Sequence, residues 1–129
     1  MNRTAIVTGA TSGFGRAIAL RLAGLGYQLI VTGRRKELLD TLTAEISEKY
    51  SASVLALNFD VRDFKACEEA VNSLPDEFKS IDLLVNNAGL AAGAAPFDQS
   101  LLDDFDRMID TNVKGLLYMT KLIVPGMIE

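Results

Sequence analysis

The amino-acid sequence predicts an α/β fold in which one parallel β-sheet is covered by helices on both faces. Short apolar runs alternate along the chain with longer segments in which apolar residues recur every three or four positions, the spacing of one helix face. The short runs are nearly continuous in apolar residues, which is typical of parallel strands buried on both sides. Right-handed crossovers between such strands give a doubly wound, Rossmann-type sheet with the strand order 3-2-1-4. Ligands of such sheets bind at the carboxyl ends of the strands, where the strand order reverses.

Four strands and three intervening helices are expected before residue 86. The strands are expected at residues 5–8, 27–32, 53–59 and 81–85. Gly9 and Gly33 close the first two strands, and Gly24 and Gly26 end the first helix. The positions that mark the helices are Ile18, Leu22 and Leu25, then Leu38, Leu39, Leu42 and Ile46, then Phe64, Cys67 and Val71.

A long fourth helix follows a loop at residues 90–96 that is rich in alanine and glycine. Ser100 and Asp103 have the spacing of a capping box, which marks the start of a helix. One stripe then runs along the helix through Leu102, Phe105, Ile109, Val113, Leu116, Thr120, Ile123 and Met127.

Composition excludes several classes of function. The chain has 129 residues, enough for one domain with a core, and its net charge of −4 disfavours a nucleic-acid partner. Its one cysteine cannot form an intrachain disulfide, and the absence of histidine removes the commonest metal ligand, so no metal is expected. No apolar run reaches the roughly 18 residues of a membrane span. The sequence enters its first strand directly, without a signal-peptide pattern, so we expect no membrane partner and a cytoplasmic location.

The turn after the first strand has the pattern Gly-x-x-x-Gly-x-Gly. Gly9 lets the chain turn sharply, Gly13 lets a pyrophosphate approach the backbone, and Gly15 lets the helix pack closely on the strand. The helix N-terminus then offers free N–H groups to phosphate oxygens. The residues predicted to bind a nucleotide here are Gly9, Ala10, Thr11, Ser12, Gly13, Phe14 and Gly15. The alternative is a glycine-rich connector without a ligand.

Together with Asn86-Asn87-Ala88-Gly89 after the fourth strand, this turn resembles the classical short-chain dehydrogenase/reductase family. The resemblance covers the whole chain. Family chains are longer, so it implies that residues 1–129 are the N-terminal, cofactor-binding portion of a longer single-domain enzyme. The stretches at residues 32–35, 58–62, 86–91 and 108–120 look like the branch of NADP-dependent 3-hydroxy acid dehydrogenases, which also oxidise serine and allo-threonine.

The end of the second strand indicates which nicotinamide cofactor is bound. An enzyme that selects NAD needs an acidic residue there for the ribose 2′-hydroxyl, but Gly33 stands at that position and Arg34 and Arg35 follow. Guanidinium groups bind phosphate through a planar fork of donors, so we predict NADP, whose extra group is a 2′-phosphate. The alternative is that both arginines belong to the solvated start of the next helix. Some NADP-preferring relatives also carry a basic residue where this chain has Ser12, so the preference rests mainly on the two arginines.

The ends of the third and fourth strands complete the expected cofactor site. The resemblance implies that Asp60 and the Val61 backbone amide contact the adenine, and that the backbone of Asn87, Ala88 and Gly89 lies beside the adenosine and ribose. Asp60 could instead cap the following helix. Asn87, with its neighbour Asn86, could instead satisfy backbone groups between neighbouring strands.

The family's chemistry is hydride transfer between the nicotinamide and a carbonyl or alcohol carbon, and it uses Asn, Ser, Tyr and Lys side chains. Asn112 matches the Asn, whose role in the family is to support a water and a helix irregularity; the alternative is an incidental polar residue. No Tyr-x-x-x-Lys is present, because Tyr27, Tyr50 and Tyr118 each lack a lysine four residues later. Cys67, on an apolar helix stripe, is expected to be a buried, inert thiol. The chain alone is therefore expected to be inactive, and the competing interpretation is a non-catalytic nucleotide-binding module or a truncated remnant.

Two surfaces of the chain are expected to lack cover. The resemblance implies a homo-oligomer, a dimer or tetramer, when the enzyme is complete, with the fourth helix at a subunit interface. Without a fifth strand, residues 81–85 become a sheet edge that has only Asp82 to blunt it. Part of the stripe between Leu102 and Met127 loses its cover as well. The chain by itself is therefore expected to self-associate.

Overall fold

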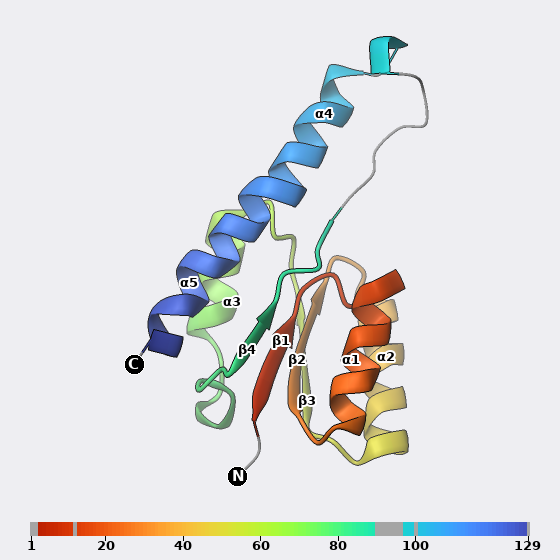
Figure 1. The fold of residues 1–129 in the computed structure, drawn as a ribbon, viewed down its shortest axis with the longest axis vertical. Coiled ribbons are helices and arrows are strands. Elements are labelled where there is room, and N and C mark those ends of the chain that lie inside the picture. Colours follow the sequence, from red (N-terminus) through yellow and green to blue (C-terminus); the bar gives the residue numbers. More distant parts are fainter. Residues whose placement is uncertain (1–2, 12, 90–96, 100, 129) are drawn as a thin grey trace.

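The computed structural model describes residues 3–11, 13–89, 97–99 and 101–128. Four parallel strands form one sheet (Figure 1): β1 (Thr4–Val7), β2 (Gln28–Gly33), β3 (Val54–Asn58) and β4 (Leu83–Val85). Their order is β3-β2-β1-β4, which confirms the predicted topology and its reversal between β1 and β4. The loop at residues 90–96 and the capping-box residue Ser100 lie outside the described residues.

Helices cover both faces of the sheet (Figure 1). On one side lie α1 (Gly13–Gly24) and α2 (Lys36–Tyr50), and on the other lie α3 (Phe64–Asn72) and α5 (Leu116–Ile128). The short 3₁₀ turns η1 (Asp76–Phe78) and η2 (Phe97–Gln99) lie between elements. A single rod runs from α4 (Leu102–Ile109) through a π-helical stretch, η3 (Asp110–Gly115), into α5, and its α4 end projects beyond the sheet. No helix in the part of the chain described is long and apolar enough to span a membrane.

The core consists of two clusters, one on each face of β1. Successive side chains of a strand point to opposite faces, so Ala5 and Val7 join the cluster under α1 and α2, whereas Ile6 joins the cluster under α3 and α5. Every residue of β1 is buried. This two-sided burial explains why the strands read as continuous apolar runs in the sequence.

The buried face of α1 differs from the predicted one. Its buried residues are Gly15, Ala19 and Ala23, whereas Ile18 and Leu22 are half-buried at its sides. Leu25 follows the last residue of the helix and is 59% exposed, so its assignment to the helix face is wrong. Small side chains let the helix lie close to the sheet, and larger ones then fill the margins of the contact.

The rod formed by α4, η3 and α5 also buries a different line from the predicted stripe. Its buried residues are Thr111, Gly115, Met119 and Ile123, and only the last belongs to the stripe. Leu102, Ile109 and Val113 are each more than half exposed, which confirms that part of the stripe lacks cover. α4 buries none of its residues because its end of the rod projects beyond the sheet, and the buried line through η3 and α5 recurs every four residues.

Candidate cofactor-binding site

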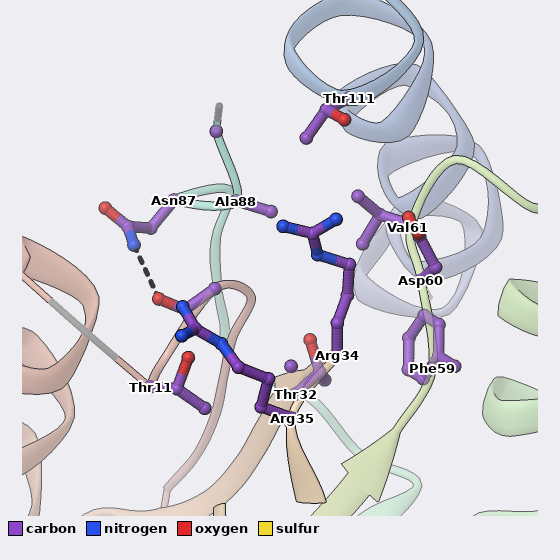
Figure 2. Close-up of a pocket in the computed structure, with 13 residues that line it drawn as sticks. Thr11, Thr32, Arg34, Arg35, Phe59, Asp60, Val61, Asn87, Ala88 and Thr111 are labelled. Carbon is purple, nitrogen blue, oxygen red and sulfur yellow. Dashed lines mark hydrogen bonds between the residues drawn. The ribbon is translucent and has the colours of Figure 1, made fainter. Parts of the chain in front are cut away.

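A cavity of about 180 Å³ lies at the carboxyl ends of the strands, at the reversal of strand order (Figure 2). Its lining residues come from every strand end and from η3: Gly9, Thr11, Thr32, Gly33, Arg34, Arg35, Phe59, Asp60, Val61, Asn87, Ala88, Gly89 and Thr111. All cofactor residues predicted after β2, β3 and β4 therefore surround one space. Their role in binding stays a prediction.

The glycine turn packs as its spacing predicts. Gly9 has φ +61°, and a Cβ there would lie 2.7 Å from the Ala88 Cα atom. A Cβ on Gly15 would overlap the Gly9 carbonyl oxygen and the Asn87 side-chain amide. The sharp turn at Gly9 and the close helix packing at Gly15 are thus confirmed. Gly13 has φ +57° with open space around the Cβ position, so the approach of a pyrophosphate to it remains a prediction.

The remaining residues of the turn divide between core and surface. Thr11 lines the cavity, whereas the Ala10 side chain is fully buried in the core and its N–H donates to the Thr32 carbonyl oxygen at 3.0 Å. Phe14 is 83% exposed at the start of α1. Ser12 lies outside the described residues.

Three hydrogen bonds, which we call the latch, join the end of β1 to the segment after β4 at one wall of the cavity. The Thr8 hydroxyl oxygen accepts hydrogen bonds from the backbone N–H groups of Asn87 (3.1 Å) and Ala88 (3.0 Å). The Asn87 side-chain amide donates to the Gly9 carbonyl oxygen at 2.9 Å, the dashed line of Figure 2. The alternative reading of Asn87 as a partner for backbone groups is therefore confirmed. Asn86 differs, because its amide donates to the Thr120 hydroxyl on α5 at 3.0 Å.

The two arginines precede α2 rather than form its first turn. The helix begins at Lys36, which pairs with Asp40 at 3.0 Å along its own surface. Arg34 and Arg35 are exposed, and neither forms an ion pair with any described residue. Figure 2 shows the Arg34 guanidinium reaching across the cavity towards Ala88 and the Arg35 guanidinium lying on the side of the glycine turn. Two cations that form no ion pair among the described residues thus border the same space.

Asp60 forms a charged pair with its neighbour. Its carboxylate accepts the Arg62 backbone N–H at 3.0 Å and the Arg62 Nε–H and Nη2–H at 2.9 and 2.7 Å. Burial works to raise the pKa of the Asp60 carboxyl, but the hydrogen bonds from Arg62 and the charges of Arg62 and Arg34 outweigh it, so this pKa lies below its ordinary value. The alternative reading of Asp60 as a helix cap is wrong, because Asp63 caps α3 by accepting the Ala66 N–H.

Comparison with known proteins decides the family. The model of the short chain dehydrogenase family matches residues 3–129. The chain belongs to the short-chain dehydrogenase family. The NADP-dependent 3-hydroxy acid dehydrogenase YdfG of Salmonella typhi is 49% identical over 124 residues, which cover 96% of this chain and 48% of the relative. The serine 3-dehydrogenase of Agrobacterium fabrum is 46% identical over 129 residues, which cover 100% and 50%. The closed form of serine dehydrogenase complexed with NADP⁺ superimposes with a TM-score of 0.86 at 45% identity, over 96% of this chain and 48% of that one.

This short-chain dehydrogenase chain spans about half the length of the curated relatives it matches. Its one matched catalytic position, Asn112, lies in η3. The Asn112 Oδ1 atom lies 3.4 Å from where a Cβ on Gly89 would be, so this side chain reaches the segment after β4. The helix irregularity that the family resemblance implies is therefore present at Asn112. Its catalytic role stays a prediction.

Sequence reasoning missed several contributors to the site of this short-chain dehydrogenase. Thr32, Phe59 and Thr111 line the cavity. Thr8, which builds the latch, does not line it. Two of these residues could have been found from their positions in the sequence. Thr8 and Thr32 each end an otherwise apolar run directly before a glycine, which places a hydroxyl at the carboxyl end of a strand.

Cys67 takes no part in the site. Its side chain is fully buried, and burial, followed by the negative charges of Asp63 and Asp60, raises the pKa of the thiol to about 11. The predicted burial of Cys67 is therefore confirmed, and the raised pKa disfavours the thiolate, which is the reactive form of cysteine. Among the described residues, no three acidic, histidine or cysteine side chains are grouped to hold a metal ion.

Proposed function

We propose that residues 1–129 are the NADP-binding portion of an NADP-dependent oxidoreductase acting on the CH–OH or C=O group of a small substrate, a 3-hydroxy acid such as serine. The observation that carries the proposal is the pair of arginines at the end of β2, without an ion-pair partner in the described chain, on the rim of a cavity at the reversal of strand order. The names of the relatives support the choice of cofactor and substrate class.

The residues present fit a dinucleotide with a 2′-phosphate. Gly9, Gly13 and Gly15 remove side chains where the turn meets the N-terminus of α1, which suits a pyrophosphate. Arg34 and Arg35 supply two forks of donors, and the absence of a carboxylate at Gly33 removes a group that would repel phosphate.

The other cofactor residues keep the roles expected for them. In the proposal, Ala10, Thr11, Ser12 and Phe14 complete the phosphate turn. Asp60 and Val61 meet the adenine, and Asn87, Ala88 and Gly89 border the adenosine and ribose. When bound, the nicotinamide supplies the hydride donor or acceptor. This chain's contribution is to hold the cofactor, with Asn112 beside the segment that follows β4.

A ligand series tests the choice of cofactor. By isothermal titration calorimetry, the chain should bind NADPH more tightly than NADH, and 2′,5′-ADP more tightly than AMP. The expected ratio is roughly 10- to 150-fold, because charge-assisted hydrogen bonds of this kind contribute about 1.5–3 kcal/mol. Equal affinities within each pair of ligands would contradict the assignment to NADP.

The 129-residue chain is expected to show no dehydrogenase activity. Asn112 cannot move a proton to or from the substrate oxygen, and the chain contains no Tyr-x-x-x-Lys. The measurement is NADPH formation from a 3-hydroxy acid and NADP⁺. Turnover that Asn112→Ala abolishes would reveal a catalytic group that the proposal lacks.

A non-catalytic nucleotide-binding module or a truncated remnant is the second candidate, favoured by the same absence of Tyr-x-x-x-Lys. The coding sequence after Glu129 discriminates the two. A serine followed by Tyr-x-x-x-Lys supports the enzyme, and a stop codon supports the module or remnant.

The chain is expected to self-associate at micromolar concentration, and an oligomeric enzyme, a dimer or tetramer, is part of the proposal. Within the described sheet, β4 pairs only with β1, so its outer edge is unpaired. The Asp82 carboxylate accepts the Thr4 N–H at 2.9 Å and so faces β1 rather than guarding that edge. Leu102, Ile109 and Val113 add exposed apolar surface. Light scattering is the measurement, and a stable monomer with a cooperative melt would refute the expectation.

A further inference from the structure

Two buried threonine hydroxyls in the cavity have no hydrogen-bond partner in the described protein. Thr32, at the end of β2, is 1% exposed, and Thr111, in η3, is 7% exposed. The Oγ1 atoms of both are buried without a partner, and both residues line the cavity. Buried hydroxyls are nearly always hydrogen-bonded, so a pair of exceptions around one space indicates partners that enter that space.

Five threonines outside the cavity lining have hydrogen-bonded hydroxyls, so the lack of a partner is not a property of the residue type. On the helices, Thr41, Thr43 and Thr120 donate to carbonyl oxygens three or four residues earlier, at 2.7 to 3.0 Å. Thr4 accepts from the Gln28 side-chain amide at 3.1 Å, and Thr8 bonds the segment after β4. Thr111 is also helical, yet it makes no such bond to its own helix.

The two hydroxyls approach the cavity from different elements. Figure 2 shows Thr111 entering from the helix on one side and Thr32 lying at the end of β2 on the other, with Val61 and Asp60 on the wall between them. This wall is where the proposed function places the adenine. A purine edge carries ring-nitrogen acceptors and, in adenine, an amine donor, and a threonine hydroxyl can both donate and accept.

We propose that the hydroxyls of Thr32 and Thr111 hydrogen-bond the purine base of the bound nucleotide and so help to determine its affinity. This inference rests on the proposed function, because it uses the same cavity. It assigns to the base two contacts that are separate from the arginine contacts to the 2′-phosphate. Loss of either hydroxyl should therefore weaken every ligand that carries the base, with or without the extra phosphate.

The test uses Thr32→Val and Thr111→Val, which remove the hydroxyl and keep the shape of the side chain. Calorimetry with AMP, NADH and NADPH should show roughly three- to tenfold weaker binding of all three ligands to each variant, and an unchanged ratio of NADPH to NADH affinity. The Tm of each ligand-free variant should rise by about 2–5 °C, because an unpartnered buried hydroxyl is replaced by an apolar group.

Thr4→Val is the matched control. Thr4 is equally buried in a strand, but its hydroxyl has a partner and it lies at the opposite end of the sheet from the cavity. Its Tm should fall and its ligand affinities should stay the same. The cavity variants should thus gain Tm and lose affinity, whereas the control should lose Tm and keep its affinity. Structural damage would lower Tm and affinity together, so this contrast supports a role of the two hydroxyls in ligand binding.

Other outcomes separate the alternatives. Unchanged affinities, or a lowered Tm in the cavity variants, would overturn the inference, since the hydroxyls would then be bonded within the free protein or its water. A loss confined to NADPH would also overturn it and assign the hydroxyls to the phosphate. If the wild-type chain binds AMP but does not prefer NADPH, the choice of NADP fails, while weaker AMP binding in the valine variants still supports the base contact.

Discussion

Replacement of Gly15 by alanine is expected to lower the free energy of unfolding by about 3 kcal/mol, despite the higher helix propensity of alanine. The new methyl group would overlap the Gly9 carbonyl oxygen and the Asn87 side-chain amide. These two groups are bonded to each other at 2.9 Å, so neither can move away without breaking the latch that joins the glycine turn to the segment after β4. Nucleotide binding should weaken as well, because the same shift displaces the turn.

Gly126→Ala is the matched control for this substitution. Gly126 lies in α5 without a positive φ, and outside its own stretch of helix no described atom lies within 4 Å of its Cβ position. Alanine there should raise stability by about 0.5–1 kcal/mol, the ordinary effect of replacing a helical glycine. Urea unfolding at equilibrium measures both changes. Equal stability of the two variants would show that the contact of α1 with the turn can relax.

Removal of both arginines is expected to abolish the preference for NADP. In Arg34→Ala/Arg35→Ala, NADPH should bind no more tightly than NADH, because each guanidinium contributes about 1.5–3 kcal/mol to a bound phosphate. NADH affinity itself should change little, since this ligand lacks the 2′-phosphate. The wild-type preference should also decline as salt is raised, because both side chains are exposed and their charges are screened.

Arg21→Ala removes one of the same charges from an exposed position in the last turn of α1, away from the cavity. It controls for a general effect of net charge and should leave the ratio of NADPH to NADH affinity intact. A double variant that kept the wild-type ratio would place the phosphate contact elsewhere in the chain.

The positions of the strands and turns were predictable because the physics that decides them is local. The run from Ala5 to Val7 is apolar because a central parallel strand is buried on both faces, and every residue of β1 is in fact buried. Gly9 is required by a positive φ at the adjacent turn. The same holds for the arginines, whose place directly after β2 puts them at the carboxyl edge of the sheet in any fold with this topology.

The missed features depend on packing between distant segments. The face that α1 buries was set by how closely Gly15, Ala19 and Ala23 let the helix approach the sheet, and a count of large apolar residues does not contain that information. The stripe along α4 and α5 failed because the α4 end of the rod projects beyond the sheet, where none of the residues of α4 is buried. The helix-cap alternative for Asp60 was wrong, because the choice between Asp60 and Asp63 depends on where the backbone of α3 begins.

The sequence by itself determined the order of elements, the reversal of strand order and the residues that gather at the strand ends, because periodicity and glycine placement act over a few residues. Only the tertiary structure decided how those residues meet. Thr8 bonds the backbone of Asn87 and Ala88, some 80 positions away in the chain. Thr32 and Thr111 come to share one cavity, where their hydroxyls have no partner among the described residues. Such contacts depend on the relative placement of whole elements, which is settled by packing across the sheet and not by local propensity.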